Sequence, residues 1–154
     1  MVYEQLKLEN QLCFPFYAIS RLITRAYQPD LDSLGITYPQ YLVLMVLWET
    51  DGMTVNAVAE KLILNTNTIT PLLKRMEEMG FLQRTPSNAD KRKVIVSLTP
   101  KGDELRHEAA TIPFNLLKRL NIQLDEKNLA ETAEFKCKLN EMIALLKALD
   151  AVDE

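Results

Sequence analysis

The sequence predicts a mainly α-helical fold with a small β-hairpin wing, a winged helix-turn-helix flanked by long N- and C-terminal helices. Three observations support this fold class. Apolar residues recur at three- and four-residue steps over most of the chain, two short helical segments joined by a tight turn occupy residues 54–80, and two short β-type runs follow with a polar tip between them. With 154 residues, 47% of them hydrophobic and 25% charged, the chain is long enough for one domain with a substantial core.

The first predicted helix covers residues 6–28. Pro15 falls inside it, and proline lacks an N–H and fits best within a first helical turn. The helix therefore either kinks at Pro15 or effectively begins near Leu12. The apolar residues that recur at helical spacing are Leu12, Phe16, Ile19, Ile23 and Ala26.

A turn-rich connection over residues 28–37 leads to the second predicted helix, residues 38–50. Thr37 is the expected N-cap of this helix, because a threonine hydroxyl can accept a hydrogen bond from a first-turn N–H. The helix is apolar almost all round, so we expect it to lie at the centre of the core. Gly52 is expected to end it.

Residues 54–64 and 65–80 form the predicted helix pair, with Thr54 as the cap of the first helix and Gly80 closing the second. The residues of the first helix expected to face inward are Val55, Val58, Ala59 and Leu62.

The predicted wing consists of strands over residues 81–85 and 93–99 around the tip 86–92, whose sequence is "PSNADKR". The second strand places Val94, Val96 and Leu98 on one face.

The C-terminal part is predicted to be helical. Thr99 and Pro100 occupy the cap and first-turn positions of a helix that runs toward Leu120 and is disturbed at Pro113, and Asp125 caps the last helix. Apolar residues in the last helix step by four, three, four and three, close to a coiled-coil seam. The seam residues are Phe135, Leu139, Met142, Leu146 and Leu149. These helices carry more apolar surface than a small winged domain can cover, which indicates a partner subunit.

The charge distribution indicates contact with nucleic acid despite a net charge of −3. Residues 61–101 carry 8 basic and 3 acidic side chains, whereas residues 1–60 carry 3 and 7 and residues 102–154 carry 7 and 11. DNA responds to the local patch of charge rather than to the average. Ordinary solvated lysines are the alternative interpretation of this pattern on charge alone.

In this fold the second helix of the pair enters the major groove of double-stranded DNA and its N-terminal side chains meet the base edges. Amides and hydroxyls suit that role, because they both donate and accept hydrogen bonds. Lys74 and Arg75 would reach phosphates one turn later, and the basic wing tip would contact the backbone or the minor groove. The predicted base-contacting residues are Asn65, Thr66, Asn67, Thr68 and Thr70, and the wing residues are Lys91, Arg92 and Lys93.

The sequence resembles the MarR family of transcriptional regulators, and within it the organic hydroperoxide resistance repressors. The segments that carry the resemblance are "LENQLCF", "LGITYPQYLVLMVLWE", "TPLLKRMEEMG" and "DKRKVIVSLTPKG", in this order. Asp90 and Arg92 resemble the Asp-x-Arg pattern of the family's wing. Asn65-Thr66-Asn67-Thr68 departs from the Asp-Ser-Gly-Thr of many relatives.

The resemblance implies one MarR-type domain over residues 1–154, in which residues 37–99 are the DNA-binding lobe and residues 1–36 and 100–154 are dimerisation helices. It implies a homodimer on a pseudo-palindromic operator that represses a peroxidase gene until its N-terminal cysteine is oxidised. The sensing cysteine would be Cys13, helped across the dimer by Tyr27 and Tyr38.

Cys13 is therefore expected to be a redox-active thiol rather than a small buried hydrophobe. If the helix starts near Leu12, Cys13 lies among first-turn N–H groups that stabilise an anion. An organic hydroperoxide would oxidise the thiolate to a sulfenic acid, which a thiol then captures as a disulfide. A low-molecular-weight thiol is the favoured captor over Cys137, because Lys118 stands where two-cysteine relatives carry their resolving cysteine.

The alternatives are an enzyme and a ligand-gated regulator. One histidine, His107, and two distant cysteines make a catalytic Cys–His pair or a metal site a poor interpretation, and four glycines leave little room for a phosphate-binding loop. We expect no enzyme activity and no cofactor, and a cytoplasmic protein without a membrane span. A MarR-type regulator gated by a small, for example phenolic, ligand is the remaining alternative.

Overall fold

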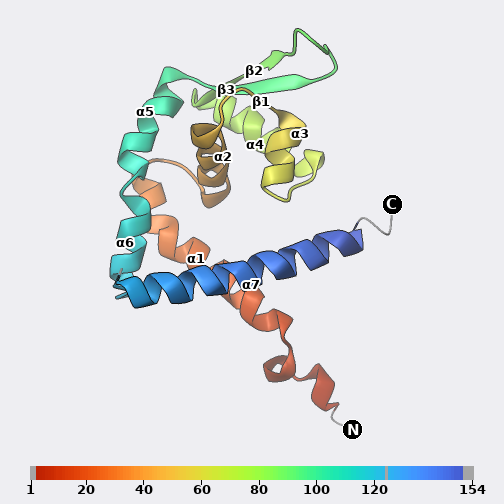
Figure 1. Ribbon diagram of the computed structural model, residues 1–154. Coiled ribbons are helices and arrows are strands. Elements are labelled where there is room, and N and C mark those ends of the chain that lie inside the picture. Colours follow the sequence, from red (N-terminus) through yellow and green to blue (C-terminus); the bar gives the residue numbers. More distant parts are fainter. Residues whose placement is uncertain (1–2, 124, 151–154) are drawn as a thin grey trace. The chain divides into compact units, whose positions relative to one another are not determined.

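The computed structural model describes residues 3–123 and 125–150 (Figure 1). These residues divide into two compact units at the boundary between Pro113 and Phe114. The first unit contains the helix pair and the wing, and the second contains the last helix.

Helix α1, Cys13–Ser33, follows two single 3₁₀ turns, Glu4–Leu6 and Leu8–Asn10. The start at Cys13 confirms the second of the two predicted alternatives, and it places Pro15 in the first turn, where a missing N–H costs little.

The prediction that residues 28–37 form a turn was wrong for its first half. Helix α1 continues through Pro29 to Ser33, because Leu31 is completely buried and anchors the last turn against the core. Beyond the helix end at Ser33, Gly35 has a φ of +66° and lets the N–H of Ile36 bond back to the carbonyl of Leu31 over 3.1 Å.

Helix α2, Tyr38–Glu49, is the centre of the core, as predicted. It begins with a capping box in which the side chain of Gln40 accepts a 2.8 Å hydrogen bond from the N–H of Thr37. Its buried residues are Gln40, Tyr41, Val43, Leu44, Val46 and Leu47.

Helices α3, Val55–Lys61, and α4, Thr66–Glu78, form the predicted helix pair. The predicted cap of α3 is confirmed, because the hydroxyl of Thr54 accepts a hydrogen bond from the N–H of Ala57. The buried face of α4 consists of Ile69, Leu73 and Met76.

The wing strands are β2, Leu82–Pro86, and β3, Val94–Leu98, paired in antiparallel register with Leu82 opposite Leu98. A third strand, β1 over Met53–Thr54, pairs with the other edge of β3 and gives the sheet order β1-β3-β2. Sequence periodicity did not indicate β1, because two residues are too short for an alternating pattern.

The predicted helix from Pro100 toward Leu120 is two helices, α5 over Pro100–Ala109 and α6 over Ile112–Arg119. The interruption lies just before Pro113, which is the second residue of α6 and therefore a favourable starting position. The predicted cap Thr99 accepts a hydrogen bond from the N–H of Gly102 over 3.1 Å.

In the second unit, helix α7 covers Glu126–Asp150, and Asp125 caps it as predicted by accepting a hydrogen bond from the N–H of Asn128 over 2.7 Å. Of the predicted seam, Leu139 and Met142 are half-buried, whereas Phe135, Leu146 and Leu149 are exposed. No helix among residues 3–123 and 125–150 is long and apolar enough to cross a membrane.

Candidate nucleic-acid interface and thiol site

The N-terminus of α4 presents a row of exposed amides and hydroxyls. Asn65 is its N-cap, and the side-chain oxygen accepts 2.9 Å hydrogen bonds from both the N–H and the hydroxyl of Thr68. Thr70 donates its hydroxyl to the carbonyl of Thr66 over 2.6 Å. Asn65 and Thr68 are thus occupied in building the helix start, while the side chains of Thr66 and Asn67 extend from it. Lys74 and Arg75 are exposed further along α4.

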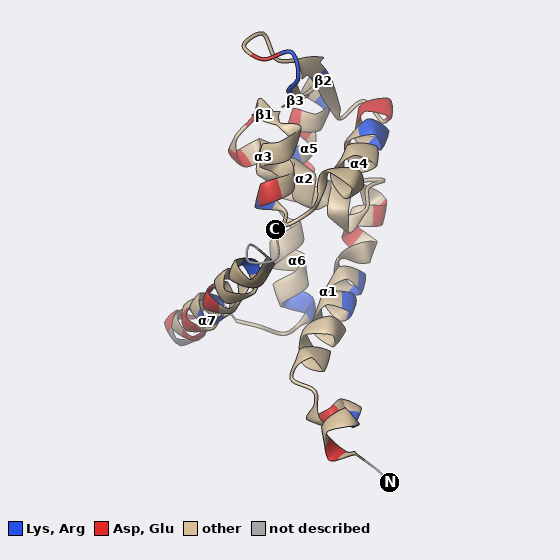
Figure 2. Ribbon diagram, turned by 90° about the vertical axis from the view of Figure 1, so that its right-hand side faces the viewer, with Lys and Arg blue, Asp and Glu red and all other residues tan. Residues whose placement is uncertain are grey.

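The wing tip is built around Asp90. The carboxylate accepts hydrogen bonds from the N–H and Nε of Arg92, both over 3.1 Å, and from Nη2 over 3.3 Å. These bonds lower the pKa of Asp90 and fix the direction of a guanidinium whose side chain is 91% exposed. Lys91 and Lys93 are exposed on either side, and Figure 2 shows the basic segment directly before β3.

A hollow of about 350 Å³ lies between α4 and the wing. Arg84 of β2 reaches this hollow although its strand neighbour Leu82 is buried. Glu77 of α4 holds Arg84 through Nε at 2.9 Å and Nη2 at 2.7 Å, and it also accepts the backbone N–H of Arg84 over 2.9 Å. The polar residues that line the hollow are Thr54, Asn56, Thr66, Thr70, Arg84, Arg92 and Lys93.

Sequence reasoning missed Asn56 and Arg84 as members of this surface. Arg84 carried a usable signal, because it lies two positions after the buried Leu82 in a strand and therefore shares the face that normally packs on the core. A charged residue at such a position indicates a partner, which in this chain is Glu77.

The tyrosines form a cluster where α1 packs on α2. The ring centroids of Tyr27 and Tyr38 are 5.1 Å apart, and those of Tyr27 and Tyr41 are 6.0 Å apart. Burial raises the pKa of all three tyrosines, so their hydroxyls keep their protons and remain hydrogen-bond donors at neutral pH. Trp48 extends the cluster at 6.2 Å from Tyr41 and donates a hydrogen bond to the carbonyl of Gly102.

Cys13 is the first residue of α1 and is exposed. Tyr27 lies 14 positions further along the same helix, which corresponds to about 21 Å of helix. The structure therefore does not bring Cys13 to Tyr27 or Tyr38 within one chain.

Fewer free N–H groups surround the thiol than we expected. Pro15 has none, and the N–H of Phe14 donates to the carbonyl of Gln11 over 3.2 Å. The second cysteine, Cys137, is exposed on α7 with its Sγ 3.7 Å from a carboxylate oxygen of Glu141.

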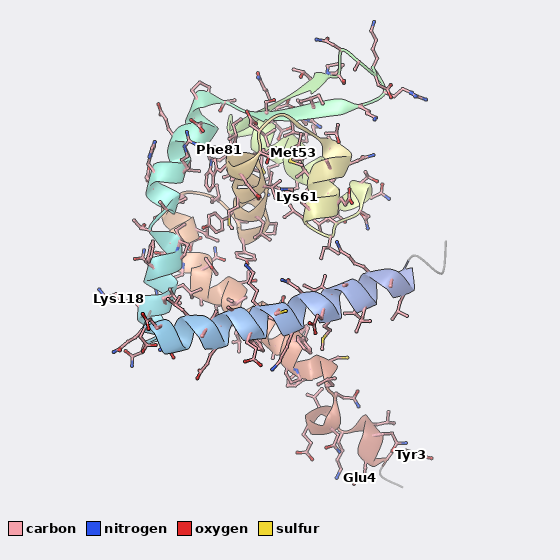
Figure 3. The ribbon with its side chains drawn as sticks, in the orientation of Figure 1. Tyr3, Glu4, Met53, Lys61, Phe81 and Lys118 are labelled. Atoms are coloured by element: carbon pink, nitrogen blue, oxygen red, sulfur yellow. The ribbon has the colours of Figure 1, made fainter. Side chains whose placement is uncertain are left out.

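Lys118 is exposed on α6 (Figure 3), and His107 is exposed on α5. In the part of the chain that the structure describes, no three His, Cys, Asp or Glu side chains are grouped to hold a metal ion.

The fold and this surface define a winged-helix DNA-binding protein. A family model described as "Transcriptional regulator SarA/Rot" matches residues 25–109. The Organic hydroperoxide resistance transcriptional regulator of Bacillus subtilis is 50% identical over 115 residues, which cover 75% of this chain and 78% of that protein. The regulator MgrA of Staphylococcus aureus is 36% identical over 124 residues, covering 80% and 84%.

Among solved structures, reduced AbfR bound to DNA is 38% identical with a TM-score of 0.76, and covers 97% of this chain and 99% of that one. AbfR of Staphylococcus epidermidis is 35% identical with a TM-score of 0.72, covering 92% and 97%. The chain therefore belongs to the MarR family of DNA-binding transcriptional regulators, in the branch of the organic hydroperoxide resistance repressors.

Proposed function

We propose that this protein is a homodimeric repressor that releases its operator when an organic hydroperoxide oxidises Cys13. The observation that carries the proposal is the separation of the thiol from the tyrosine pair. Cys13 is exposed at one end of α1, and Tyr27 with Tyr38 lies about 21 Å away toward the other end. A site made of these residues is complete only if a second subunit brings its tyrosines to the thiol of the first.

Exposed apolar surface supports the dimer. Helix α1 and the turns before it leave Leu6, Leu12 and Leu22 at 74%, 73% and 59% exposed, and α7 leaves Leu145 and Leu149 at 71% and 63%. Exposed apolar surface in this amount marks protein–protein interfaces. Both lie in the segments predicted as dimerisation helices.

The redox step follows from the chemistry of a thiolate. The Sγ of Cys13 attacks the peroxide oxygen that carries hydrogen, the O–O bond breaks, and the leaving alkoxide takes up a proton to become an alcohol. The sulfur is oxidised by two electrons to a sulfenic acid while the peroxide is reduced. The thiolate of a low-molecular-weight thiol then attacks this sulfur and displaces hydroxide, which leaves as water, to form a mixed disulfide.

The neighbours of Cys13 favour an organic oxidant. Phe14, Phe16 and Tyr17 are 37%, 39% and 62% exposed, so the thiol stands among apolar side chains that can contact an alkyl or aryl group. The tyrosine hydroxyls of the partner, which stay protonated, would donate hydrogen bonds to the thiolate and to the sulfenate oxygen.

The same tyrosines connect the thiol to the DNA-binding surface. Tyr27 and Tyr38 join α1 to α2, and α2 packs against both α3 and α4. An adduct on Cys13 that displaces the tyrosine pair of the partner would move α2 and, with it, α4, the recognition helix that packs against α2. The dimer would then lose the half-site spacing that binding to a two-fold operator requires.

The test measures affinity for a duplex from upstream of the protein's own gene, before and after one equivalent of cumene hydroperoxide, with and without a small thiol. The wild type is expected to lose binding on oxidation, Cys13→Ser to keep it, and the matched control Cys137→Ser to behave as the wild type. Mass spectrometry should show the thiol adduct on Cys13. Continued binding by the oxidised wild type, or release by oxidised Cys13→Ser, would contradict the redox mechanism.

One observation favours regulation by a small ligand as the second candidate. A hollow of about 520 Å³ lies between the end of α2 and the start of α5, with Trp48 and Leu98 among its lining residues. An aromatic ring beside an apolar side chain is a suitable contact surface for a phenolic ligand. Release of DNA by such a compound in Cys13→Ser would support this candidate over oxidation.

A further inference from the structure

The hollow lies between α4 and the wing, the two elements that are expected to enter different grooves of DNA. If the N-terminus of α4 enters the major groove and the tip of the wing reaches the adjacent minor groove, one sugar–phosphate strand must pass between them. The hollow is the space that this strand would cross, since Thr66 and Thr70 of α4 line one side and Arg92 and Lys93 of the wing line the other.

The composition of the hollow fits a phosphodiester. Arg84, Arg92 and Lys93 supply positive charge, Thr66 and Thr70 supply hydroxyls, and an asparagine of α3 supplies an amide. Among the described residues that line the hollow, none is acidic. Arginine and hydroxyl groups are the usual partners of DNA phosphates.

Arg84 is oriented in the same way as the wing arginine. In both residues Nε and Nη2 bond a carboxylate, that of Glu77 for Arg84 and that of Asp90 for Arg92. Each guanidinium keeps Nη1 out of these bonds and is fixed in direction by its carboxylate. The side chain of Arg84 is only 23% exposed, so this residue is more constrained than Arg92 at 91%. Fixing a cation before binding lowers the entropic cost of the contact.

We propose that this hollow binds a phosphodiester of the DNA strand between the two grooves, with Arg84 as the phosphate contact and Glu77 as the residue that positions it. The inference rests on the DNA-binding function and adds a contact that neither the recognition helix nor the wing tip supplies. Phosphate contacts set register without reading sequence. Arg84 therefore contributes equally to specific and non-specific binding.

The experiment compares Arg84→Met, Glu77→Gln and the matched control Arg106→Met. Arg106 is also an arginine paired with a carboxylate, Asp103 at 2.8 Å, but it lies on α5 outside the hollow. Dissociation constants are measured between 50 and 200 mM salt on the upstream duplex and on an unrelated duplex of the same length, and melting temperatures are measured in parallel. These concentrations are of the order at which phosphate contacts control affinity.

Arg84→Met is expected to weaken binding to both duplexes by roughly tenfold for each subunit. It is also expected to reduce the slope of log K against log salt by about 2 per dimer, since one phosphate contact is lost in each subunit. Glu77→Gln keeps every cation, so the slope should stay unchanged, and adding it to Arg84→Met should produce no further loss of affinity. Arg106→Met should change neither quantity.

The inference is overturned if Arg84→Met keeps the wild-type salt slope, or if Arg84→Met and Glu77→Gln lose melting temperature and affinity in parallel with unchanged slopes. That result would mean that the Glu77–Arg84 pair stabilises the fold and does not contact DNA. Should Arg84→Met fail to fold, Arg84→Lys serves instead, because a retained point charge keeps the slope while the loss of the guanidinium fork weakens binding on both duplexes. No binding by the wild type to either duplex would refute the DNA-binding function itself.

Discussion

The same residue type has opposite environments in two regions of this molecule. In the lobe formed by α2 to α5, Leu44, Leu73 and Leu82 are at most 1% exposed. In the terminal helical segments, Leu12 and Leu145 are more than 70% exposed. Burying a leucine contributes about 1.5–3 kcal/mol to stability. The lobe is therefore held together by its own contacts. The exposed leucines at the two ends would contribute a comparable free energy only if another surface covered them.

The DNA-binding surface and the proposed sensing site depend on different regions of the molecule. Each chain builds its DNA-reading surface by itself, because α4, the wing and the Glu77–Arg84 pair all lie within one unit. The proposed sensing site needs a second chain, because Cys13 and Tyr27 lie at distant positions on one helix. In the proposed mechanism, sensing would therefore act on DNA binding through the dimer without a change in the core of the lobe.

The largest expected effect is Gly102→Ala, which tests whether the lobe depends on its own packing. A Cβ at Gly102 would lie 1.9 Å from the carbonyl oxygen of Phe81, a backbone atom that cannot move aside. We expect a loss of about 3 kcal/mol or more in unfolding free energy, measured by thermal and urea unfolding.

Gly35→Ala is the matched control for this substitution. Gly35 has a φ of +66°, but in the described part of the chain no atom lies within 4 Å of the position that a Cβ would take. We therefore expect only the backbone cost of about 1 kcal/mol. Equal effects at the two glycines would show that close packing between α5 and the wing is not what holds the lobe.

The next effect tests whether the exposed helices form the dimer. Leu146→Glu places a charge in the predicted seam of α7, and we expect the dimer to dissociate at least roughly a hundredfold more readily, because burying an unpaired carboxylate costs several kcal/mol. Ile63→Glu is the control, since both side chains are 57% exposed. Sedimentation should show monomers only for Leu146→Glu, with unchanged helix content by circular dichroism. A wild-type dimer in Leu146→Glu would exclude the seam as the interface.

Most of the first unit could be predicted from local sequence, and the reasons are physical. The caps Thr37, Thr54 and Thr99 satisfy helix N–H groups with their own neighbours, so a short window contains all the information needed to place them. The end of α1 could not be placed in this way. Pro29 and the polar residues around it indicated a turn, but burial of Leu31 by tertiary contacts extended the helix to Ser33.

In the candidate site too, some residues could be predicted from local sequence, whereas others depend on tertiary contacts. The exposed amides and hydroxyls of α4 and the basic wing were visible as a composition pattern, whereas the contribution of Arg84 depends on Glu77, seven positions away on another element. A pair of this kind is formed by the packing of a helix against a strand, and no local periodicity encodes it. The roles of Tyr27 and Tyr38 came from the family resemblance alone, and the ring cluster with Tyr41 is what the fold adds.

The smallest expected effect is the contribution of Glu77 to the stability of the lobe as the pH changes. Hydrogen bonds from Arg84 lower the pKa of Glu77 below its ordinary value of 4.5. Between the folded and unfolded pKa values the unfolded chain binds more protons, so the stabilising contribution is complete above pH 4.5 and is lost as the pH falls through the folded pKa. With Glu77 35% exposed, solvent screening limits this contribution to a few tenths to about 1 kcal/mol.

Melting temperatures between pH 3 and 6, roughly the range in which carboxylates titrate, should therefore fall less steeply in Glu77→Gln than in the wild type. Asp90→Asn is the comparison, because the pKa of Asp90 is also lowered by an arginine, but Arg92 is almost fully solvated at the wing tip. We expect its acid profile to match the wild type, since an exposed, solvent-screened pair contributes little to folding. If Asp90→Asn flattened the profile as much as Glu77→Gln, the wing tip would be part of the cooperative lobe rather than a solvated arm ordered by its own hydrogen bonds.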